Sequence, residues 1–429
     1  MKNLAEFCAA HISDDLTRLI LDRRKWPEID MDMAVNSIES RRKLKGKVQE
    51  WYDNPSLVFP LKLSAEQCSS SNTARYKADL AEKIAGQGFR IADLTGGLGV
   101  DSWHFSQKAS AVLYNEMQNV LCKAAEYNFS VLESTNVAIS NNSIVPSDGI
   151  SSDTDISPEL LLTGFRPDIV FIDPARRSES GKKVFLIEDC TPDVLKLKDE
   201  IFGVCRHILI KLSPMADISM ACNRLGSCCR EVHIISSEGE CKELLIWMDR
   251  EWEGEYSISA IEIHGDDSHT EFRFMPSEEK SEICDIMTAS VYEDIRNDAS
   301  SYFLFEPGKA MMKAGAFNLT GSRFNLIKLG KSTHYYIFKE NISEEDLCLS
   351  ETMKRYGKVF RILSCSPLDK KTMKEAGKTY PKSEVTARNI PMDTETLRKK
   401  LCVTSGDDAH IFGLKSDVAG NLLFCTQRA

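Results

Sequence analysis

The stretch from Arg90 to Asp101 constrains the fold of this chain more than any other. It reads Arg-Ile-Ala-Asp-Leu-Thr-Gly-Gly-Leu-Gly-Val-Asp, a short apolar run that ends in an acid and continues through glycines into helix-forming sequence. Gly97 and Gly99 allow positive φ angles and a close approach of a ligand to the backbone. Strand, tight turn and helix N-terminus in this order are typical of a unit that holds a nucleotide-like ligand at the carboxyl end of a parallel strand.

The acid at the end of this strand narrows the choice of ligand. The Asp93 carboxylate would repel the pyrophosphate of a dinucleotide, whereas it suits a ligand that carries an ammonium and a sulfonium group. Ser102 also stands where the dinucleotide fingerprint has its third Gly or Ala. The residues therefore favour S-adenosylmethionine over a dinucleotide. The alternative is a strand-to-helix turn that binds no ligand.

Apolar, strand-like runs recur through the middle of the chain, with helical or loop segments between nearly all of them. They lie at 89–94, 111–114, 135–139, 168–172, 207–212, 231–235 and 243–248. The last two are close together, which predicts a mostly parallel seven-stranded sheet that ends in an antiparallel hairpin. We therefore expect a Rossmann-like, doubly wound α/β domain over 63–275, with its ligand crevice at the carboxyl ends of the strands.

Polar residues at the ends of these runs are the next candidates for ligand contacts. Glu116 follows the second strand, about 20 residues after the glycine loop, where a carboxylate can accept both ribose hydroxyls. Asn142 follows the third strand and is a candidate for the adenine amino group, with a polar turn as the alternative. Upstream, a serine run caps a helix that is expected to reach Ala85, and Thr73 near its start is a candidate for the ligand's carboxylate. A simple N-cap is an equal alternative there.

The fourth strand ends in Asp173-Pro174-Ala175-Arg176. Proline removes a backbone donor and stiffens the turn, which leaves carbonyl oxygens free to point into the crevice. An acid beside a fixed carbonyl can hold an amine with its lone pair aimed at a methyl sulfonium, and positioning supplies most of the acceleration of such a displacement. Asp173 can also receive the departing proton. An ordinary Asp-Pro turn is the alternative.

Taken together, these motifs resemble the class I S-adenosylmethionine-dependent methyltransferases. In that family an Asp-x-x-x-Gly-x-Gly loop wraps the methionine part, an acid ends the second strand, and Asp/Asn-Pro-Pro-aromatic ends the fourth. The resemblance implies Asp173, Pro174 and Arg176 as catalytic residues. It implies a cofactor site made of Asp93, Thr95, Gly97, Gly99, Asp101, Glu116, Asn142 and Thr73.

The chain departs from the family's last motif, because Ala175 replaces the second proline and Arg176 the aromatic. An arginine plane can stack on a base or grip a phosphate. Asp-Pro-x-Arg also occurs in pyrimidine-C5 RNA methyltransferases, which need a cysteine nucleophile, commonly at the end of the fifth strand. Here 209–214 reads Leu-Ile-Lys-Leu-Ser-Pro, so methylation of nitrogen is favoured. Lys211 is expected near the crevice, in a structural or phosphate-binding role.

A wider resemblance covers nearly the whole chain. It is similar to a bacterial family of methyltransferases with a THUMP-like C-terminal domain, seen in Bacteroidetes-type genomes, through residues 69–77, 173–177, 184–193 and 306–317. This implies a ferredoxin-like segment at 300–350 and a THUMP-like domain at 357–429. Apolar residues at helical spacing predict a separate helical domain at 1–62. THUMP domains help to dock tRNA, so an RNA partner is implied by analogy.

Charge and cysteine usage limit the possible partners and cofactors. The net charge of −10 argues against a protein that coats nucleic acid non-specifically. Residues 353–400, however, hold 13 basic and 5 acidic side chains, an excess of 8 that suits RNA phosphates or is simply a solvated face. The run 41–47 adds a second basic segment. Fourteen cysteines without Cys-x-x-Cys, and no signal or membrane-length apolar run, predict a reduced, metal-free, cytoplasmic protein.

The sequence thus favours a methyltransferase that modifies a base nitrogen in structured RNA, tRNA before rRNA, through its basic C-terminal modules. Two alternatives remain open. The substrate is instead a protein side chain or a small molecule, or the chain is an S-adenosylmethionine-binding RNA scaffold without catalysis. Monomer and homodimer are both compatible with the sequence.

Overall fold

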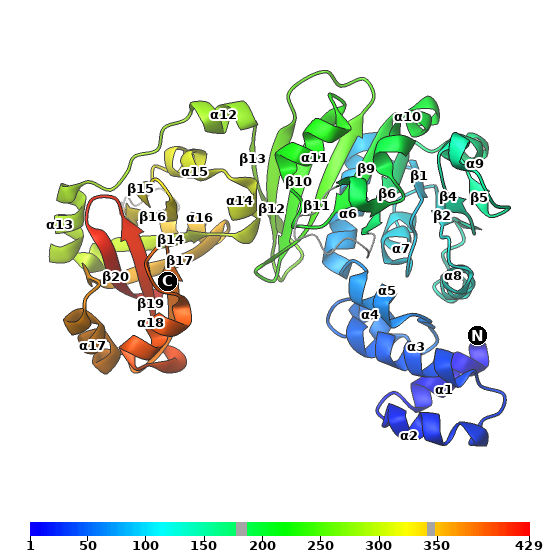
Figure 1. Ribbon diagram of the computed structural model, residues 1–429, viewed down its shortest axis with the longest axis horizontal. Helices are drawn as coiled ribbons and strands as arrows, with labels where there is room; N and C mark the ends of the chain where they lie inside the picture. The colour runs from blue at the N-terminus through cyan, green and yellow to red at the C-terminus, as the bar shows by residue number, and fades with distance from the viewer. Residues whose placement is uncertain (177–186, 341–347) are drawn as a thin grey trace. The chain divides into compact units, whose positions relative to one another are not determined.

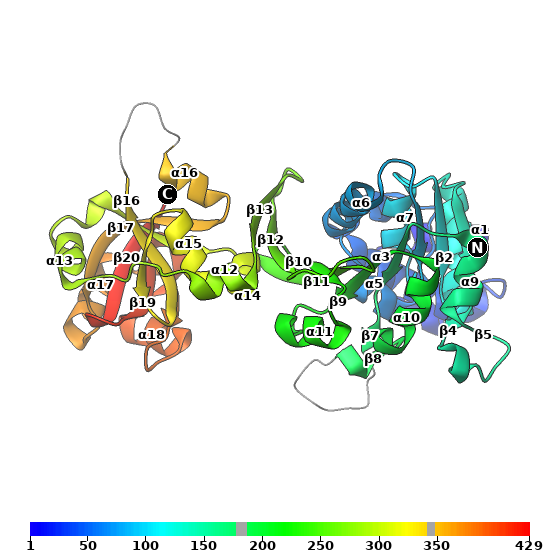
Figure 2. The same ribbon diagram turned by 90° about the horizontal axis from the view of Figure 1, so that it is seen from above.

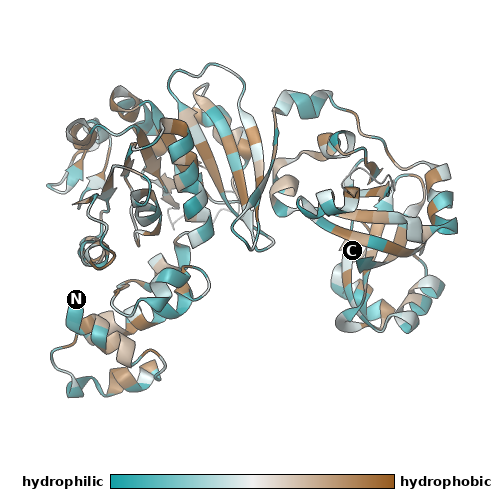
Figure 3. Cartoon of the chain, turned by 180° about the vertical axis from the view of Figure 1, so that it is seen from behind, coloured by the Kyte–Doolittle hydropathy of each residue, from teal (hydrophilic) through white to brown (hydrophobic). Residues whose placement is uncertain are grey.

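The computed structural model describes residues 1–176, 187–340 and 348–429 (Figure 1). The chain divides into two compact units. Unit 1 comprises residues 1–233 and 242–256, and unit 2 comprises residues 234–241 and 257–429. In both, many of the hydrophobic residues (brown) lie on the strands, whereas the helices carry a mixture of hydrophobic and hydrophilic (teal) residues (Figure 3).

Unit 1 is built on a twisted, mostly parallel sheet, as the spacing of apolar runs predicts. Among the described residues, seven strands of a nine-stranded sheet follow the order β3-β2-β1-β6-β9-β11-β10. All neighbours from β3 to β9 pair in parallel, and β11 runs antiparallel to β9. The strands are β1 (Arg90–Asp93), β2 (Ala111–Asn115), β3 (Val137–Ser140), β6 (Ile169–Ile172), β9 (His207–Leu212), β10 (Cys229–Ser237) and β11 (Glu240–Asp249).

Helices cover both faces of this sheet. Helices α6 (Ser71–Ala85) and α7 (Val100–Ser106) lie on one face, whereas α9 (Pro158–Phe165) and α10 (Val194–Val204) lie on the other (Figure 2). Each residue of β6 is buried, as expected for a central parallel strand with helices on both sides. The remaining elements are α8 (Asn119–Val131), α11 (Ile218–Leu225) and the short strands β4 (Ser143–Ile144), β5 (Asp155–Ile156), β7 (Ala175–Arg176) and β8 (Cys190–Thr191). This arrangement confirms the predicted fold class.

The N-terminal segment is helical, as predicted, and part of it packs against the glycine loop. A first apolar cluster joins α1 (Lys2–Ala10), α2 (Leu16–Leu21) and α3 (Met31–Leu44). A second cluster contains Trp51 of α4 (Gln49–Asp53) and Ala65 of α5 (Lys62–Gln67) together with Leu98 and Val100. The second half of the segment therefore shares a core with the loop that the sequence identifies as a ligand site.

The basic run at 41–47 is mainly structural. Arg41 is 3% exposed, and its guanidinium donates to four backbone carbonyls between residues 51 and 57 at 2.6–3.2 Å. Arg42 donates to two carbonyls of the loop after α1, and Lys47 to the carbonyls of Ala65 and Glu66. These cations satisfy carbonyl groups where the chain turns, so they are poor candidates for a nucleic-acid surface.

Unit 2 is an α+β body with a sheet of order β15-β16-β14-β17-β20-β19-β18. Its strands are β14 (Tyr302–Pro307), β15 (Ile327–Gly330), β16 (Thr333–Lys339), β17 (Gly357–Pro367), β18 (Lys382–Arg388), β19 (Thr404–Ser416) and β20 (Gly420–Arg428). A hairpin of β12 (Ser257–Ile263) and β13 (His269–Phe274) precedes them. The helices are α12 (Pro276–Ser281), α13 (Ala289–Asn297), α14 (Lys309–Ala314), α15 (Phe317–Arg323), α16 (Leu349–Lys354), α17 (Lys370–Thr379) and α18 (Thr394–Leu401).

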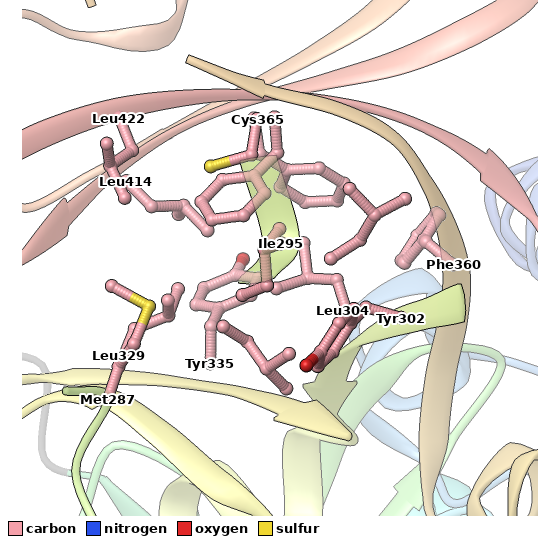
Figure 4. Close-up of a cluster of buried hydrophobic side chains, with 14 residues drawn as sticks. Met287, Ile295, Tyr302, Leu304, Leu329, Tyr335, Phe360, Cys365, Leu414 and Leu422 are labelled. Atoms are coloured by element: carbon pink, nitrogen blue, oxygen red, sulfur yellow. The ribbon is translucent and has the colours of Figure 1, made fainter. Parts of the chain in front are cut away.

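The two C-terminal segments that the sequence separates at about residue 350 share one sheet and one core. Strand β14 pairs antiparallel with β17, which joins the two segments edge to edge. Leu304 and Tyr335 from the first segment pack with Phe360, Leu414 and Leu422 from the second (Figure 4). Neither segment could be removed without exposing this shared apolar cluster, so we expect them to fold together.

Candidate active site

A cavity of about 1020 Å³ opens in unit 1, where the carboxyl ends of β1, β2, β6 and β9 meet. Residues 93–101 of the glycine loop form one wall, and residues 116–118 and 142–145 continue it past the second and third strands. Residues 173–175 and 211–213 lie at the ends of β6 and β9. The N-terminal segment adds four residues of α5 and its end, which are Leu63, Ser64, Gln67 and Cys68. The cavity therefore lies where a doubly wound sheet is expected to bind its ligand.

The glycine loop has its shape because side chains are excluded from it. Gly97 and Gly99 have φ angles of +54° and +95°, in the left-handed region. Gly96 is restricted by contact instead, because a Cβ there would lie 2.2 Å from the Cε2 atom of Tyr114. The Tyr114 hydroxyl donates to the carbonyl of Gly97 at 2.6 Å and holds the ring in place. A Cβ at Gly99 would lie 3.0 Å from Phe129, whereas one at Gly97 would meet nothing closer than 3.8 Å, so packing as well as φ angle favours glycine in this loop.

Asp93 is 1% exposed and is held from two sides. Ser102 Oγ donates to its Oδ2 at 2.6 Å, and the Thr95 amide donates to its Oδ1 at 3.1 Å. Burial raises the pKa of the Asp93 carboxyl to about 7, although the Ser102 hydrogen bond opposes this. Ser102, which departs from the dinucleotide fingerprint, thus orients the acid that the sequence identified. A cation in the cavity would supply the counter-charge that Asp93 lacks.

Glu116 and Asn142 both line the cavity, as the strand-end argument predicts. Glu116 accepts the Gly97 amide at Oε2 (3.0 Å) and the Gln118 amide at Oε1 (2.8 Å). Each carboxylate oxygen can accept a second bond, so hydroxyls of a ligand can still be bound. The Asn142 amide donates to Ser140 Oγ at 2.5 Å, which fixes the end of β3.

Thr95 links the glycine loop to the Asp-Pro motif. Its hydroxyl accepts the backbone amide of Asp173 at 2.7 Å. Asp173 and Pro174 both line the cavity, and the Asp173 side chain is 37% exposed. The two motifs that the sequence singled out are therefore brought together at adjacent strand ends.

One predicted cofactor contact, Thr73, is not found at the cavity. Thr73 is 1% exposed at the start of α6, where its hydroxyl lies 3.2 Å from Ser70 Oγ, and it is not among the residues that line the cavity. Arg176 is described only through its backbone, which pairs with Cys190 in the β7–β8 ribbon. Arg177 and the first residues of the 184–193 motif lie outside the described residues.

Sequence reasoning missed a fully buried lysine behind the glycine loop. Lys77 of α6 is 0% exposed, and its ammonium lies 2.9 Å from Asp101 Oδ1 and 2.8 Å from Glu243 Oε1. Ser69 Oγ accepts from Lys77 at 2.6 Å and donates to Asp101 Oδ2 at 2.7 Å. Burial raises the pKa of Asp101, but Lys77 and Lys211 outweigh it and hold that pKa below its usual value. Asp101 is thus engaged by the protein itself.

Lys211 is the second buried cation, and it contacts the Asp-Pro motif directly. Its ammonium lies 2.6 Å from Asp173 Oδ2 and 3.9 Å from Glu243 Oε2. Burial lowers the pKa of the Lys211 ammonium, but the carboxylates of Asp173, Glu243 and Asp101 outweigh it and hold that pKa above its usual value. The sequence signal for both lysines is the same: a charge at a position that the apolar periodicity assigns to the core.

Other kinds of site are not found in the described parts of the chain. Within residues 1–176, 187–340 and 348–429, no His, Cys, Asp or Glu side chains cluster in a way that would hold a metal ion. A search of the same residues for a helix long and apolar enough to cross a membrane also gave none.

Comparisons with known proteins agree with this architecture. Residues 303–344 match a family model described as a ferredoxin-like domain, and residues 357–428 match one described as THUMP domain-like. No curated protein matches the chain.

The crystal structure of a "putative methyltransferase" from Porphyromonas gingivalis W83 is similar over 100% of this chain and 98% of its own, with 26% identity and a TM-score of 0.79. SMU.1697c from Streptococcus mutans in complex with SAH covers 41% of this chain and 95% of its own, with 10% identity and a TM-score of 0.28. An rRNA methylase from Streptococcus thermophilus covers 41% and 93%, with 12% identity and a TM-score of 0.29. The chain combines a methyltransferase-type, Rossmann-like α/β domain with a ferredoxin-like and a THUMP-like domain, the organisation that its sequence predicts.

Proposed function

We propose that the protein is an S-adenosylmethionine-dependent methyltransferase that methylates a base nitrogen in structured RNA, tRNA before rRNA. One observation carries the proposal. One cavity holds two groups of residues. Asp93 and Glu116 supply carboxylates for a cofactor, Asp173 and Pro174 lie where the methyl acceptor would bind, and Thr95 links the two groups. Such a division suits a cationic nucleoside cofactor beside a neutral amine.

The residues of the first group fit S-adenosylmethionine part by part. Asp93, buried without a cationic partner in its hydrogen-bond set, suits the ammonium of the methionine part. Glu116 retains acceptor capacity for the ribose hydroxyls, and Asn142, which lines the same cavity, suits the adenine amino group. The bare backbone at Gly97 and Gly99 permits close approach. When bound, the cofactor supplies a methyl group on a sulfonium.

The residues of the second group hold the acceptor. Asp173 Oδ2 is taken by Lys211, and Oδ1 has no partner among the described residues. Oδ1 is therefore available to accept an N–H of the acceptor amine, while Pro174 presents no N–H that would compete. The nitrogen lone pair forms the new N–CH₃ bond as the S–CH₃ bond breaks, its electron pair stays on sulfur, and the nitrogen then loses a proton to water. Asp173 contributes orientation.

A lysine-rich face in unit 2 supports an RNA partner. Helices α17 and α18 pack so closely that a Cβ at Gly377 would lie 1.8 Å from the Leu401 carbonyl. Six exposed lysines lie on these helices: Lys370, Lys371, Lys374, Lys378, Lys399 and Lys400. None forms an ion pair within the described residues, and three recur every four positions along one side of α17. Exposed lysines without ion-pair partners suit phosphates, which position an RNA without reading its sequence.

The test uses labelled methyl groups. Purified protein is incubated with methyl-labelled S-adenosylmethionine and with small RNA, ribosomal RNA and total protein from a strain that lacks the gene. Label in the tRNA fraction that is lost with Asp173→Ala, while cofactor binding is kept, is the expected result. Label in protein alone would move the substrate to a side chain. Cofactor binding with no transfer to any fraction would leave an RNA-binding scaffold and overturn the enzymatic proposal.

A further inference from the structure

The charged side chains behind the cavity form one connected chain. Asp101, at the start of α7, contacts Lys77, and Lys77 contacts Glu243 of β11. Glu243 in turn lies 3.9 Å from Lys211 of β9, which contacts Asp173 at 2.6 Å. Three carboxylates thus alternate with two ammonium groups. The alternation runs from the glycine loop at one end to the Asp-Pro motif at the other.

Stability alone gives a poor reason for this arrangement. The strand around Lys211 is otherwise apolar, with Leu209, Ile210 and Leu212 at most 3% exposed. A buried ion pair is often no more stable than a well-packed apolar pair of similar volume, because desolvation offsets the Coulomb attraction. A lysine near the carboxyl end of this buried strand is therefore better explained by its contact with Asp173, which lines the cavity.

We propose that Lys211 is a positioning residue, which holds Asp173 Oδ2 so that Oδ1 is presented to the methyl acceptor, and that Glu243 anchors Lys211 from behind. The acceptor role of Asp173 rests on the proposed function, whereas the fixing of its carboxylate by Lys211 does not. With Oδ2 bound at 2.6 Å and the Asp173 backbone amide bound to Thr95, both ends of the residue are fixed. A carboxylate held in this way loses little freedom when it binds an amine.

The first experiment needs neither cofactor nor substrate. The Asp173 side chain is 37% exposed, so a water-soluble carbodiimide with an amine nucleophile can reach it, and mass spectrometry reports the extent of labelling. Lys211→Met frees Oδ2 and is expected to increase the labelling rate of Asp173 severalfold. Lys211→Arg keeps a cation on Oδ2 and is expected to stay near the wild type. Equal labelling of all three proteins would overturn the proposal.

The second experiment measures turnover with the RNA fraction that accepts label. Lys211→Met is expected to lower kcat on the order of a hundredfold, the cost of misplacing a reacting group by about 1 Å. Its dissociation constant for S-adenosylmethionine should stay within about threefold, and Lys211→Arg should recover most of kcat. Unchanged kcat, or loss of cofactor binding with kcat kept, would contradict a positioning role. Should Lys211→Met fail to fold, Glu243→Gln removes the anchor instead and is expected to increase Asp173 labelling in the same way.

The two experiments separate the inference from the proposed function. Increased labelling of Asp173 in Lys211→Met, without any methyl transfer by the wild type, would keep the positioning contact and reject the enzyme. Methyl transfer by the wild type with unchanged labelling and kcat in Lys211→Met would keep the enzyme and reject the role of Lys211.

Discussion

Replacing Lys77 by methionine removes the cation that joins two buried carboxylates. In the wild type its ammonium contacts Asp101 at 2.9 Å and Glu243 at 2.8 Å, and the side chain is 0% exposed. Methionine has a similar length but no charge, so both carboxylates keep their burial and lose this partner. Removing one member of a buried ion pair costs about 3–5 kcal/mol, and we expect Lys77→Met to lower the free energy of unfolding by that amount at pH 7.5.

Lys108 provides a matched control. Its ammonium also contacts two carboxylates, Asp79 and Glu82, each at 2.7 Å, but its side chain is 30% exposed. Exposed pairs contribute about 1 kcal/mol or less each, so Lys108→Met should cost no more than about 1–2 kcal/mol. Comparing the loss of stability in Lys77→Met and Lys108→Met thus distinguishes the effect of burial from that of ion pairing.

The pH dependence of the loss follows from Asp101. Its pKa is lowered in the folded wild type, so its contribution to stability is present above the unfolded pKa and is lost as pH falls through the folded value. Without Lys77 the burial of Asp101 is less compensated, and its pKa moves upward. The difference between wild type and Lys77→Met should therefore be largest at neutral pH and shrink as pH falls below about 5.

Urea unfolding followed by tryptophan fluorescence measures this difference. All five tryptophans, at positions 26, 51, 103, 247 and 252, lie in unit 1, so the signal reports the unit that contains Lys77. Similar losses for Lys77→Met and Lys108→Met, or a loss for Lys77→Met that grows toward acid pH, would refute the reasoning.

Three further predictions concern the ligand site and the lysine face. Because burial raises the pKa of Asp93 to about 7, cationic S-adenosylmethionine should bind about tenfold more weakly per pH unit below 7. Calorimetry in buffers of different ionisation enthalpy should detect the proton that Asp93 releases on binding. Asp93→Asn should remove the pH dependence of binding, and a flat wild-type profile would contradict this prediction. Gly96→Ala places a Cβ 2.2 Å from the Tyr114 ring and should lower the free energy of unfolding by about 1–3 kcal/mol and weaken cofactor binding. In Gly97→Ala the Cβ meets no atom closer than 3.8 Å, so the expected loss of stability is only the backbone strain of about 1–2 kcal/mol. Equal cofactor binding by both variants would be inconsistent with the close contact at Gly96. Changing Lys370, Lys374 and Lys378 together to Gln should reduce the slope of log affinity for RNA against log salt concentration by on the order of one unit per lysine. Lys280→Gln in α12 is the surface control. An unchanged slope in the triple variant would exclude these lysines from RNA contact.

The sheet was predictable because its signal is local. Every apolar run from Phe89 to Met248 became a strand. The central parallel strands are apolar because helices cover both of their faces. The glycine loop was predictable for a related reason, because few sequences other than an acid followed by spaced glycines make that turn. Asp93, Glu116 and Asp173 were found because residues at the carboxyl ends of neighbouring strands must meet.

Residues that come together through packing were harder to find. Glu243 follows the glycine loop by more than 140 positions and reaches the site only because β11 inserts between β9 and β10. Nothing local to Lys77 marks Asp101 and Glu243 as its partners. Conversely, Thr73 was proposed from its place before the glycine-loop strand, but its hydroxyl bonds within the first turn of α6. The basic run at 41–47 gives the same lesson, because carbonyl groups far along the chain bind its arginines.

The sheet that the two C-terminal modules share could not be predicted from local sequence. The family resemblance implied a ferredoxin-like segment at 300–350 and a THUMP-like domain at 357–429, and a family model matches each of them. The β14–β17 pairing joins the two in one sheet. The sequence of either segment alone does not indicate a pairing between strands so far apart along the chain, because any edge strand offers the same backbone groups to a partner.

The central claim is that the cavity at the strand ends binds S-adenosylmethionine, and calorimetry tests it most directly. Titrating S-adenosylmethionine into the wild type and into Glu116→Ala and Asp173→Ala, with NAD⁺ as the competing ligand, separates the cofactor-binding residues from the acceptor-binding residues. The account predicts one site per chain, binding weakened at least tenfold by Glu116→Ala, binding kept by Asp173→Ala, and no competition by NAD⁺. Absence of binding by the wild type, or displacement by NAD⁺, would contradict it.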